Sequence, residues 1–296
     1  MKISYSANQR LLELIDEIEF NTESQGITNP RGLTVKESLM AGIVIDTQYP
    51  CLNFKSRPFN YKYFAGEVAW YLYQNRKVNF INNFSKFWNN IKDEDNKVNS
   101  NYGHILLKNR PATSQVAWIV NTLKKDKDSR QAIAFISDKK YQYEGNKDFV
   151  CTLYLNFFIR NNTLYMKVQM RSQDIIFGSW YDLPWFSTVH QNVYLELQKF
   201  YPELQLGKYF HFMDNVHFYE RHFDLIEKIK SESDEITAGP KLTLKNPLWM
   251  SNESGETELT KEAKNFLNLV SDKIKIMDNM TWDDWKTVLE TIYDIN

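Results

Sequence analysis

Two cysteines, Cys51 and Cys151, are the candidate nucleophiles of this chain. Cys151 lies inside a β-rich run, KDFVCTLYLNF, where an isolated cysteine is most often a buried core thiol. A nucleophilic thiol instead needs cationic neighbours that lower its pKa, and Arg171 ends the strand predicted to pair with this one. Cys151 is therefore a candidate for covalent catalysis, whereas Cys51, in YPCLNF, has no comparable setting and is interpreted as structural.

The segment 169–185, QMRSQDIIFGSWYDLPW, is the most informative in the chain. It combines an arginine, a serine and two aspartates with a glycine: Arg171, Ser172, Asp174, Asp182 and Gly178. A solvated loop would not normally carry Ile-Ile-Phe and Trp-Tyr between its charges. The combination is typical of a pocket with apolar walls and a few polar groups directed at a ligand.

Hydrophobic periodicity predicts the elements that position these residues. Two β runs, 150–160 and 163–171, are joined by Asn161-Asn162, which is a hairpin signal because asparagine tolerates positive φ. Strand and helix runs do not alternate regularly, so an α+β fold is favoured over a doubly wound sheet. The remaining predicted elements are helices over 8–19, 61–76, 185–200 and 217–230 and strands over 132–137 and 205–213.

The C-terminal part of the chain is predicted to be an extension. Around 231–257 the composition shifts to Ser, Glu, Pro and Gly, which makes this stretch the best candidate linker. An amphipathic helix is predicted over 259–276, and Thr281-Trp282-Asp283-Asp284 opens a last helix with a capping-box pattern. We expect a catalytic domain over 1–235 and, over 236–296, a strand and helices packed on the same domain.

Composition and charge exclude several classes of function. With 36 Lys and Arg against 37 Asp and Glu, the net charge is −1, so no global field attracts nucleic acid or an anionic membrane. No apolar run reaches the roughly 18 residues of a membrane span, and the N-terminal residues lack the apolar core of a signal peptide. None of the five histidines has a metal-ligand spacing with a cysteine. We expect a cytoplasmic protein without a metal and without a direct nucleic-acid or membrane partner.

Together these residues resemble the nucleotide-binding core of the thymidylate synthases. That family has a Cys nucleophile on a strand, then Gln-Arg-Ser-x-Asp, a Gly and a Pro-Phe-Asn segment that leads into a helix. Cys151, the run 169–174, Gly178 and Asp182 follow the same order here, with one residue inserted between Gln and Arg. Further matches, in order along the chain, are Arg31, Glu67, Trp88, Tyr102-Gly103, Asp128-Ser129-Arg130 and Asn215-Val216-His217-Phe218-Tyr219.

The resemblance implies a thymidylate-synthase-like fold, with a mixed β-sheet, flanking helices and a homodimer formed through the sheet. It implies a catalytic role for the residues Cys151, Glu67, Asp182 and Tyr102. It implies that the nucleotide is bound by Asp182 together with Arg31, Arg130, Arg171, Ser172, His217 and Tyr219, with Arg130 contributed across the dimer interface. It implies that the folate site includes Trp88, Asp174 and Gly178. Taken singly, Trp88 and Tyr102 are also compatible with core aromatics, Glu67 with a paired core acid and His217 with a structural histidine.

The departures from the thymidylate synthase pattern are as informative as the matches. Asp182 replaces an Asn that pairs with O4 and N3–H of uracil in that family; a carboxylate instead suits the N4 amino donor of cytosine. Thr152 follows Cys151 where the family has His, and the C-terminal TIYDIN lacks the apolar tail that closes the folate site. These features resemble the bacteriophage deoxycytidylate hydroxymethylases, which share Cys-Thr, Asn-Ser-Asn-Tyr-Gly and Tyr-x-Arg-His. Gln131, in place of a second Arg, fits neither branch.

The resemblance therefore implies transfer of a hydroxymethyl group from 5,10-methylenetetrahydrofolate to C5 of dCMP, for modified phage DNA, by a homodimer that could join a nucleotide-synthesis complex. Cys151 would attack C6, and water organised by Glu67 would replace the hydride of thymidylate synthase. Three alternatives stay open: hydroxymethylation or methylation of dUMP, action on CMP, and a non-catalytic nucleotide-binding protein. Asp182 argues against the first, nothing in the sequence excludes the second, and the presence of both Cys151 and Glu67 argues against the third.

Overall fold

The computed structural model describes residues 5–109, 113–233 and 237–296. Its centre is a mixed sheet with the strand order β1-β6-β4-β3-β2 and a short strand β5 that pairs with β6. β4 and β5 run parallel to β6, and the other pairs in this sheet are antiparallel. The strands are β1 Val35–Ile45, β2 Ile133–Phe135, β3 Thr152–Arg160, β4 Thr163–Met170, β5 Gln173–Asp174 and β6 Gln205–Tyr219.

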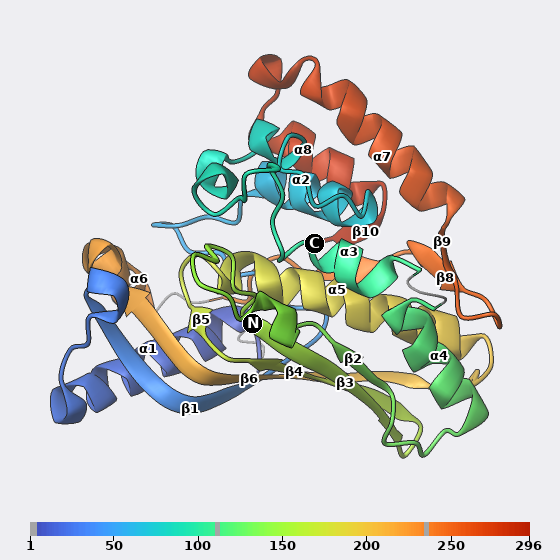
Figure 1. Ribbon diagram of the computed structural model, residues 1–296, viewed down its shortest axis with the longest axis horizontal. Helices are drawn as coiled ribbons and strands as arrows, with labels where there is room; N and C mark the ends of the chain where they lie inside the picture. Colours follow the sequence, from blue (N-terminus) through green and yellow to red (C-terminus); the bar gives the residue numbers. More distant parts are fainter. Residues whose placement is uncertain (1–4, 110–112, 234–236) are drawn as a thin grey trace.

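Helices cover one face of this sheet. In Figure 1 the sheet forms the lower part of the molecule, and α5, Ser179–Gln198, lies directly above it. The other helices before the C-terminal extension are α1 Ala7–Gln25, α2 Tyr61–Leu72, α3 Tyr102–Leu107, α4 Gln115–Lys125 and α6 Phe223–Ser231. A mixed sheet with flanking helices confirms the predicted α+β class.

The predicted hairpin is present because two asparagines make the turn. Asn161 and Asn162 have φ values of 48° and 55°, a left-handed conformation that asparagine adopts more readily than most residues. The turn sets Arg160 opposite Thr163, and the register then runs back along β3 and β4 toward the start of β3. This register decides which residues meet at the far end of the hairpin.

The helix predicted over 217–230 is wrong in its first part. β6 continues to Tyr219, and α6 begins only at Phe223, after a 3-10 turn over 220–222. The end of β6 lies between β1 and β5, so backbone partners on both sides favour an extended conformation there. His217 therefore lies on the sheet, opposite Asp174 of β5.

The stretch 231–257 was predicted to be a linker, but it contains strands that pack on the core. β7, Leu242–Leu244, buries both of its leucines, and β8, Trp249–Ser251, buries its tryptophan. Two buried amides of α5 accept hydrogen bonds from this backbone: Gln191 from the Leu244 N–H at 2.6 Å and Asn192 from the Leu248 N–H at 2.7 Å. A few large apolar residues thus anchor a stretch whose overall composition is that of a loop.

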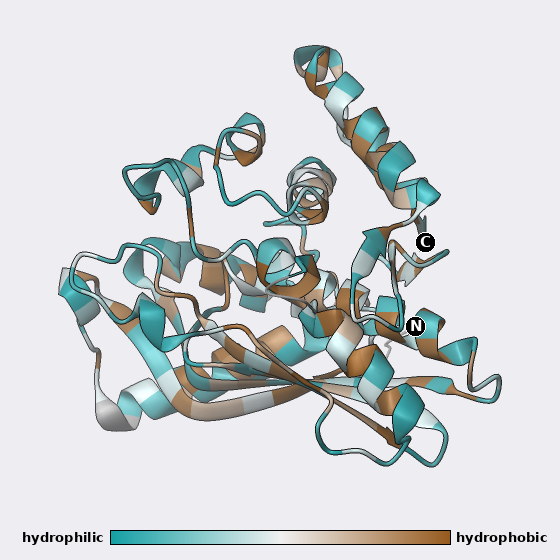
Figure 2. Ribbon diagram, turned by 45° about the vertical axis from the view of Figure 1, so that its right-hand side comes forward, coloured by the Kyte–Doolittle hydropathy of each residue, from teal (hydrophilic) through white to brown (hydrophobic). Residues whose placement is uncertain are grey.

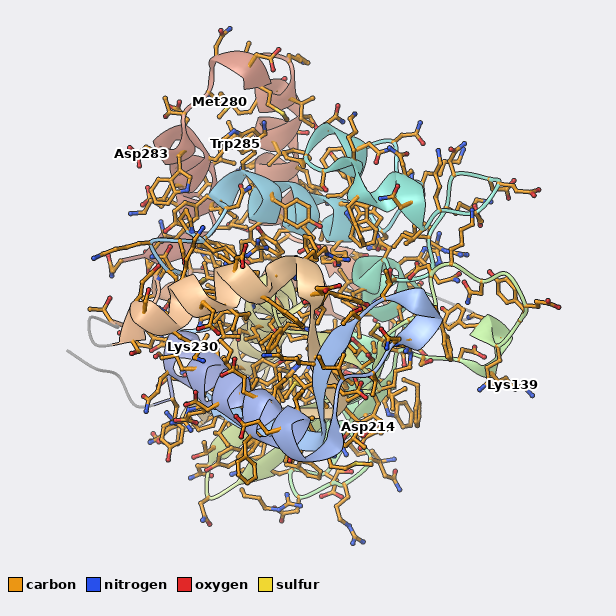
Figure 3. The ribbon with its side chains drawn as sticks, turned by 90° about the vertical axis from the view of Figure 1, so that its left-hand side faces the viewer. Lys139, Asp214, Lys230, Met280, Asp283 and Trp285 are labelled. Atoms are coloured by element: carbon orange, nitrogen blue, oxygen red, sulfur yellow. The ribbon has the colours of Figure 1, made fainter. Side chains whose placement is uncertain are left out.

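The C-terminal elements lie over α2, the helix that carries Glu67. α7, Lys261–Ile274, and α8, Trp282–Glu290, both contact α2, and Trp285, labelled in Figure 3, is buried with its ring 5.4 Å from that of Phe84. Thr281 opens α8 with both hydrogen bonds of the predicted capping box. Strand β9, Thr257–Leu259, pairs with β8, and β10, Tyr293–Ile295, pairs with β7.

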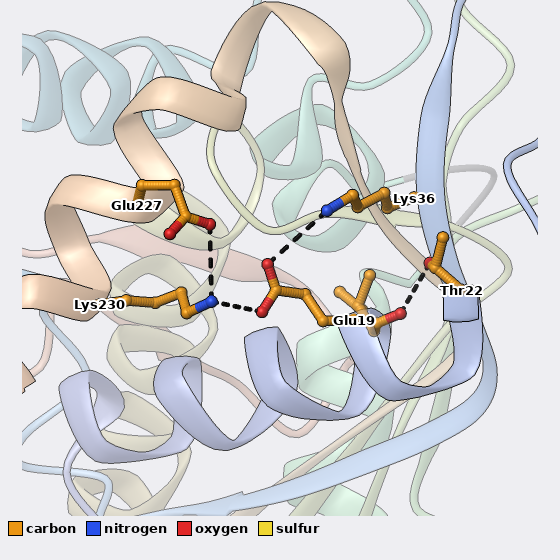
Figure 4. A network of polar contacts seen from close by, with 6 residues as sticks. Glu19, Thr22, Lys36, Glu227 and Lys230 are labelled. Carbon is orange, nitrogen blue, oxygen red and sulfur yellow. Dashed lines mark hydrogen bonds and ion pairs between the residues drawn. The ribbon is translucent and has the colours of Figure 1, made fainter. Parts of the chain in front are cut away.

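The N-terminal helix is joined to its neighbours by ion pairs shown in Figure 4. Glu19 of α1 lies 2.5 Å from Lys230 of α6 and 3.7 Å from Lys36 of β1. These side chains are partly exposed, and such pairs contribute only about 0–1 kcal/mol each. The buried face of α1, which includes Leu11 and Ile15, therefore supplies most of the attachment.

The opposite face of the sheet carries no helix in the described part of the chain. Alternation along the central strands gives it the side chains of Tyr154, Phe158, Tyr165, Lys167, Phe210 and Phe212, while most of their neighbours in sequence are buried on the other side of the sheet. Figure 2 shows the hydrophobic colouring of the strands in this layer. An open apolar surface of this kind is typical of a protein–protein interface.

Candidate active site

Cys151 lies directly before β3, where the hairpin brings Arg171 against it, as its register predicted. The Arg171 N–H donates to the Cys151 carbonyl at 2.8 Å, and a guanidinium nitrogen lies 3.5 Å from Cys151 Sγ. The guanidinium also donates to the carbonyls of Val150, at 3.1 Å, and Phe149, which fixes its position. Burial raises the pKa of the Cys151 thiol, and the charges of Arg171 and Arg31 act in the opposite direction.

Cys51 has a contrasting environment. It is fully buried in the hydrophobic core, and burial raises the pKa of its thiol well above the ordinary value. No cation among the described residues opposes that effect. Such a thiol stays protonated and behaves as a small apolar side chain.

Glu67 ends a short chain of hydrogen bonds. Trp88 Nε1 donates to the Tyr63 hydroxyl at 3.1 Å, and that hydroxyl donates to Glu67 Oε1 at 3.1 Å. Glu67 is 4% exposed, and its second oxygen, Oε2, accepts no well-aligned hydrogen bond from the described residues, although the Tyr71 hydroxyl lies close enough to lower the pKa of this carboxyl. Burial, followed by the nearby charge of Asp182, raises the pKa of Glu67 to about 8. A carboxyl group that titrates near neutrality, with one oxygen that accepts no well-aligned hydrogen bond, is suited to proton exchange with a ligand or water.

The Asn-Ser-Asn-Tyr-Gly motif holds Tyr102 beside the start of β3. The Asn101 side chain caps α3 by accepting from the His104 N–H at 2.7 Å and donates to two backbone carbonyls near the end of α2, at 3.2 and 3.3 Å. The Tyr102 hydroxyl accepts a hydrogen bond from Thr152 Oγ1 at 2.9 Å. Tyr102 and Cys151 are thus connected through one residue, Thr152.

Asp182 lies in the first turn of α5, which begins at Ser179 rather than at the predicted residue 185. Gln173 Nε2 donates to Asp182 Oδ2 at 3.0 Å. Gly178 leaves no room for a side chain, because a Cβ there would lie 2.5 Å from Gln173 Nε2 and 3.1 Å from Asp182 Oδ2. Burial raises the pKa of Asp182 to about 7, against the effect of the hydrogen bond from Gln173.

Asp174 closes the turn between β5 and α5. Its Oδ1 accepts from the N–H groups of Ile176, at 2.8 Å, and Phe177, at 3.1 Å. Arg57 supports the same turn by donating to the Ile176 carbonyl at 3.1 Å, with its guanidinium 4.7 Å from the centre of the Trp180 ring. The Asp174 carboxylate therefore stabilises this turn, a structural contact in addition to the role in the folate site that the resemblance implies.

A chain of hydrogen bonds from His217 to Glu37 determines which ring nitrogen of His217 carries the proton. Asn215 Nδ2 donates to Glu37 Oε2 at 2.6 Å, so the amide oxygen of Asn215 faces His217 Nδ1, at 2.8 Å, as an acceptor. His217 Nδ1 must then carry the proton. Burial lowers the pKa of His217, which favours the neutral ring. Its Nε2 is therefore an acceptor, and the ring edge packs on Tyr219, with centroids 5.1 Å apart.

Arg31 and Ser172 lie at the more open end of the site. Arg31 is exposed in a turn over 30–32 and has a φ of 56°, an uncommon value for a residue with a side chain. Its charge lowers the pKa of both Cys151 and His217, so it faces the same region as they do. Ser172 is partly exposed directly after β4.

Arg130 is remote from Cys151 of its own chain. β2 and β3 are antiparallel with Ile133 opposite Asn156, so extending this register sets Arg130 level with Ile159. Ile159 is eight residues from Cys151, or roughly 26 Å at about 3.3 Å per residue of strand. The structure thus gathers the other predicted site residues around Cys151 but leaves exposed Arg130 at the opposite end of the sheet.

Tyr63 and Gln173 contact predicted site residues, although the sequence did not indicate a role for either. Tyr63 precedes Glu67 by four positions, and residues four apart lie on the same side of a helix, so the spacing alone could have identified it. Gln173 lies within the quoted Arg-Ser-x-Asp run at the variable position. Its contact with Asp182 depends on how β5 meets α5, which the local sequence does not determine.

Comparison with known proteins identifies the family. A sequence model described as thymidylate synthase matches residues 11–259. The chain belongs to the thymidylate synthase family. It is 26% identical over 212 residues to the deoxycytidylate 5-hydroxymethyltransferase of Enterobacteria phage T6, covering 69% of this chain and 84% of that one. It is 28% identical over 205 residues to the deoxyuridylate hydroxymethyltransferase of Bacillus phage SP01, covering 64% of this chain and 52% of that one.

The fold agrees with that membership. A thermostable thymidylate synthase A from Bacillus subtilis superposes with a TM-score of 0.62 at 18% identity, covering 85% of this chain and 95% of the other. The predicted thymidylate-synthase-like fold is therefore confirmed, and the protein is a one-carbon transferase of the thymidylate synthase superfamily. Within the described ranges, no group of three or more His, Cys, Asp or Glu residues could hold a metal ion. No helix in those ranges is long and apolar enough to cross a membrane.

Proposed function

We propose that this thymidylate synthase family member transfers a hydroxymethyl group from 5,10-methylenetetrahydrofolate, with water, to C5 of dCMP, giving 5-hydroxymethyl-dCMP and tetrahydrofolate for modified phage DNA in the host cytoplasm. The observation that carries the proposal is the Asp182 carboxylate, fixed by Gln173 at 3.0 Å where the thymidylate synthases have an Asn. The similarity to the phage T6 deoxycytidylate enzyme, which extends over 84% of that protein, is consistent with this choice.

Base recognition follows from hydrogen-bond complementarity. Cytosine has an amino donor at N4, whereas uracil has an acceptor at O4. An ionised Asp182 accepts from N4–H but meets O4 acceptor to acceptor. Leaving a buried polar group unpaired costs about 1–3 kcal/mol, and more when the group is charged, so the carboxylate discriminates against uracil.

The first chemical step is assigned to Cys151. Its thiolate adds to C6, which converts C5 into a nucleophilic enamine carbon that attacks the one-carbon unit of the folate. Arg171, 3.5 Å from Sγ, stabilises the thiolate and holds the 5′-phosphate together with Arg31 and Ser172. Loss of the C5 proton, for which Tyr102 and a water are the candidates, and departure of tetrahydrofolate then leave an exocyclic methylene group.

The second step is addition of water to that methylene group. Glu67 is assigned as the general acid–base that organises the water, because Tyr63 holds its Oε1 while Oε2 accepts no well-aligned hydrogen bond from the described residues, Tyr71 being the phenol beside it. The hydroxide equivalent bonds to the methylene carbon, and the thiolate leaves C6 as the ring double bond forms again. Hydride from the folate takes no part, so tetrahydrofolate is the folate product.

The proposal includes a homodimer formed through the open face of the sheet. That face is rich in exposed aromatic side chains, among them Phe212 at 40% and Phe135 at 62% exposure. Arg130, roughly 26 Å from Cys151 of its own chain by the strand spacing, would then contact the phosphate in the partner's site. His217 Nε2 and Tyr219 are assigned to the ribose 3′-hydroxyl, and Trp88, Asp174 and Gly178 to the folate side.

Steady-state kinetics with dCMP, dUMP and CMP, each with 5,10-methylenetetrahydrofolate, test the proposal. We expect kcat/KM for dCMP to exceed that for dUMP by about 10³-fold or more, since a site built on hydrogen-bond matching discriminates by up to about 10⁴–10⁵. A preference for dUMP would contradict the assignment of the base. A preference for CMP would support the assignment of cytosine as the base and contradict the assignment of deoxyribose as the sugar.

A further inference from the structure

The side chain of Gln173 is buried at the meeting of β5 and α5 and is 2% exposed. Its Nε2 lies 3.0 Å from Asp182 Oδ2, 3.3 Å from Ser179 Oγ and 3.5 Å from the Asp174 carbonyl. All three atoms can accept a hydrogen bond, and the carbonyl can only accept. The amide is therefore oriented with its nitrogen toward the carboxylate of Asp182.

The oxygen of this amide makes no hydrogen bond that would explain a polar side chain at this position of the described chain. Gln173 Oε1 is buried and has no hydrogen-bond partner among the described residues. An apolar side chain of the same length would fill the space without burying an unpaired oxygen. The polar group at this position is thus explained by its contact with Asp182 rather than by space filling.

The groups around Asp182 make that contact significant. Acids, phenols and a thiol of the surrounding elements lie close enough to interact electrostatically with it, namely Glu67 and Tyr71 of α2, Tyr102 of α3, Cys151 before β3, Asp174 of β5 and Tyr209 of β6. No cation belongs to this set of described neighbours. Burial raises the pKa of Asp182 to about 7. Among the interactions with these neighbours, the hydrogen bond from Gln173 favours the charged form of Asp182.

We propose that Gln173 is a positioning residue for base selection: its amide keeps the Asp182 carboxylate ionised and in one orientation, so the preference for cytosine over uracil increases with pH. A protonated Asp182 can donate to O4 of uracil, whereas the ionised form accepts from N4–H of cytosine. This inference rests on the proposed function, because it assumes that Asp182 meets the base.

The test is the ratio of the dissociation constants of dUMP and dCMP, measured by calorimetry between pH 5.5 and 9 without folate. Titration of the phosphate and of groups remote from the base affects both nucleotides and cancels in the ratio. For the unmodified enzyme we expect the preference for dCMP to increase through an apparent pKa of about 7. For Gln173→Met, that midpoint should move upward by about one pH unit, which lowers the preference by about five- to tenfold near pH 7.

Gln169→Met is the matched control. Gln169 Nε2 makes the same kind of hydrogen bond, at 2.7 Å, to Asp214 on the open side of the sheet, so its loss should leave the ratio and its midpoint unchanged. If Gln173→Met does not fold, Gly178→Ala replaces it, because the new Cβ would lie 2.5 Å from Gln173 Nε2 and displace the amide. That variant should move the same midpoint upward.

Each outcome decides the inference. If Gln173→Met weakens both nucleotides equally and keeps the midpoint, the residue is merely structural and the inference is wrong. If the preference for dCMP is present in the unmodified enzyme but does not change in either variant, the inference fails while the proposed function stands. If the unmodified enzyme shows no preference for dCMP at any pH, the proposed function itself fails, and the inference with it.

Discussion

The end of the site assigned to the base and the end assigned to the phosphate differ in how many of their residues one chain supplies. At the end assigned to the base, Gln173 donates to Asp182 at 3.0 Å, and Gly178 leaves no free space beside them. At the end assigned to the phosphate, Arg31 is exposed in a turn and Arg130 lies at the far end of the β2–β3 pair. Recognition of a base edge requires donors and acceptors in fixed directions, whereas recognition of a phosphate requires charge and reach. The first can be built inside one chain, and the second can be shared between chains.

Cys151 interacts electrostatically with residues of both ends, Asp182 and Arg31, and its replacement should have the largest effect. Cys151→Ala should lower turnover of dCMP by at least about 10⁴-fold, because covalent activation of C5 is lost. Binding of dCMP should change by less than about tenfold, since the contacts at both ends remain. Rapid-quench assays and calorimetry measure the two quantities. Cys51→Ala is the control and should keep its activity; an inactive Cys51 variant beside an active Cys151 variant would reverse the assignment.

Replacement of Asp182 by Asn tests the rigid end. The amide can serve both O4 and N3–H of uracil, and it removes the acceptor for N4–H, so kcat/KM for dCMP should decrease by about 10³-fold while use of dUMP increases. The product should remain hydroxymethylated, because Glu67 and Trp88 are unchanged. Kinetics of both nucleotides, with identification of the products, provide the measurement. An unaltered preference would show that Asp182 does not contact the base.

The open end is tested by mixing two impaired variants at a dCMP concentration too low to saturate Arg130→Ala. Arg130→Ala should weaken phosphate binding by about 10²-fold, since a charge-assisted contact is lost. If Arg130 crosses the interface, subunit exchange between Arg130→Ala and Cys151→Ala should restore about a quarter of the wild-type sites, because half of the dimers are mixed and each has one complete site. Proven exchange without recovered activity would mean that each site is built from one chain.

Loss of the Tyr63 hydroxyl should have the smallest of these effects. Tyr63→Phe removes the donor to Glu67 Oε1 and the acceptor for Trp88 Nε1, so kcat should decrease about tenfold. The hydroxyl opposes the raised pKa of Glu67, so the limb of the pH–rate profile that reports Glu67 should move above about 8. Tyr73→Phe, which loses only contacts to α7, is the control. If that limb of the pH–rate profile does not move, Tyr63 does not affect the ionisation of Glu67 during catalysis.

The sequence predicted those features that depend on a few neighbouring residues. The Asn161-Asn162 turn and the capping box at Thr281 are local in this sense, and both are present. The order of motifs from Arg31 to Tyr219 also led to the correct family. The approach of Arg171 to Cys151 followed from the hairpin register alone.

Other features depend on contacts between distant segments and were missed. The end of β6 was predicted to be helical because its partners, β1 and β5, are far away in the sequence. The stretch 231–257 was predicted to be a linker from its composition, which does not show that the buried amides of Gln191 and Asn192, on the distant helix α5, hold its backbone. The role of Gln173 likewise required the meeting of β5 with α5. The division into a catalytic domain and an extension, and the roles assigned to the site residues, stay predictions.

The central claim is hydroxymethyl transfer to dCMP, and the mass of the product tests it most directly. The enzyme is incubated with dCMP and 5,10-methylenetetrahydrofolate in water enriched in heavy oxygen, with dUMP and CMP in parallel, and the nucleotides are analysed by mass spectrometry. We predict that dCMP gains CH2O, that the added oxygen is the heavy isotope and that tetrahydrofolate accumulates. A gain of CH2 with formation of dihydrofolate, or modification of dUMP in preference to dCMP, would contradict the account.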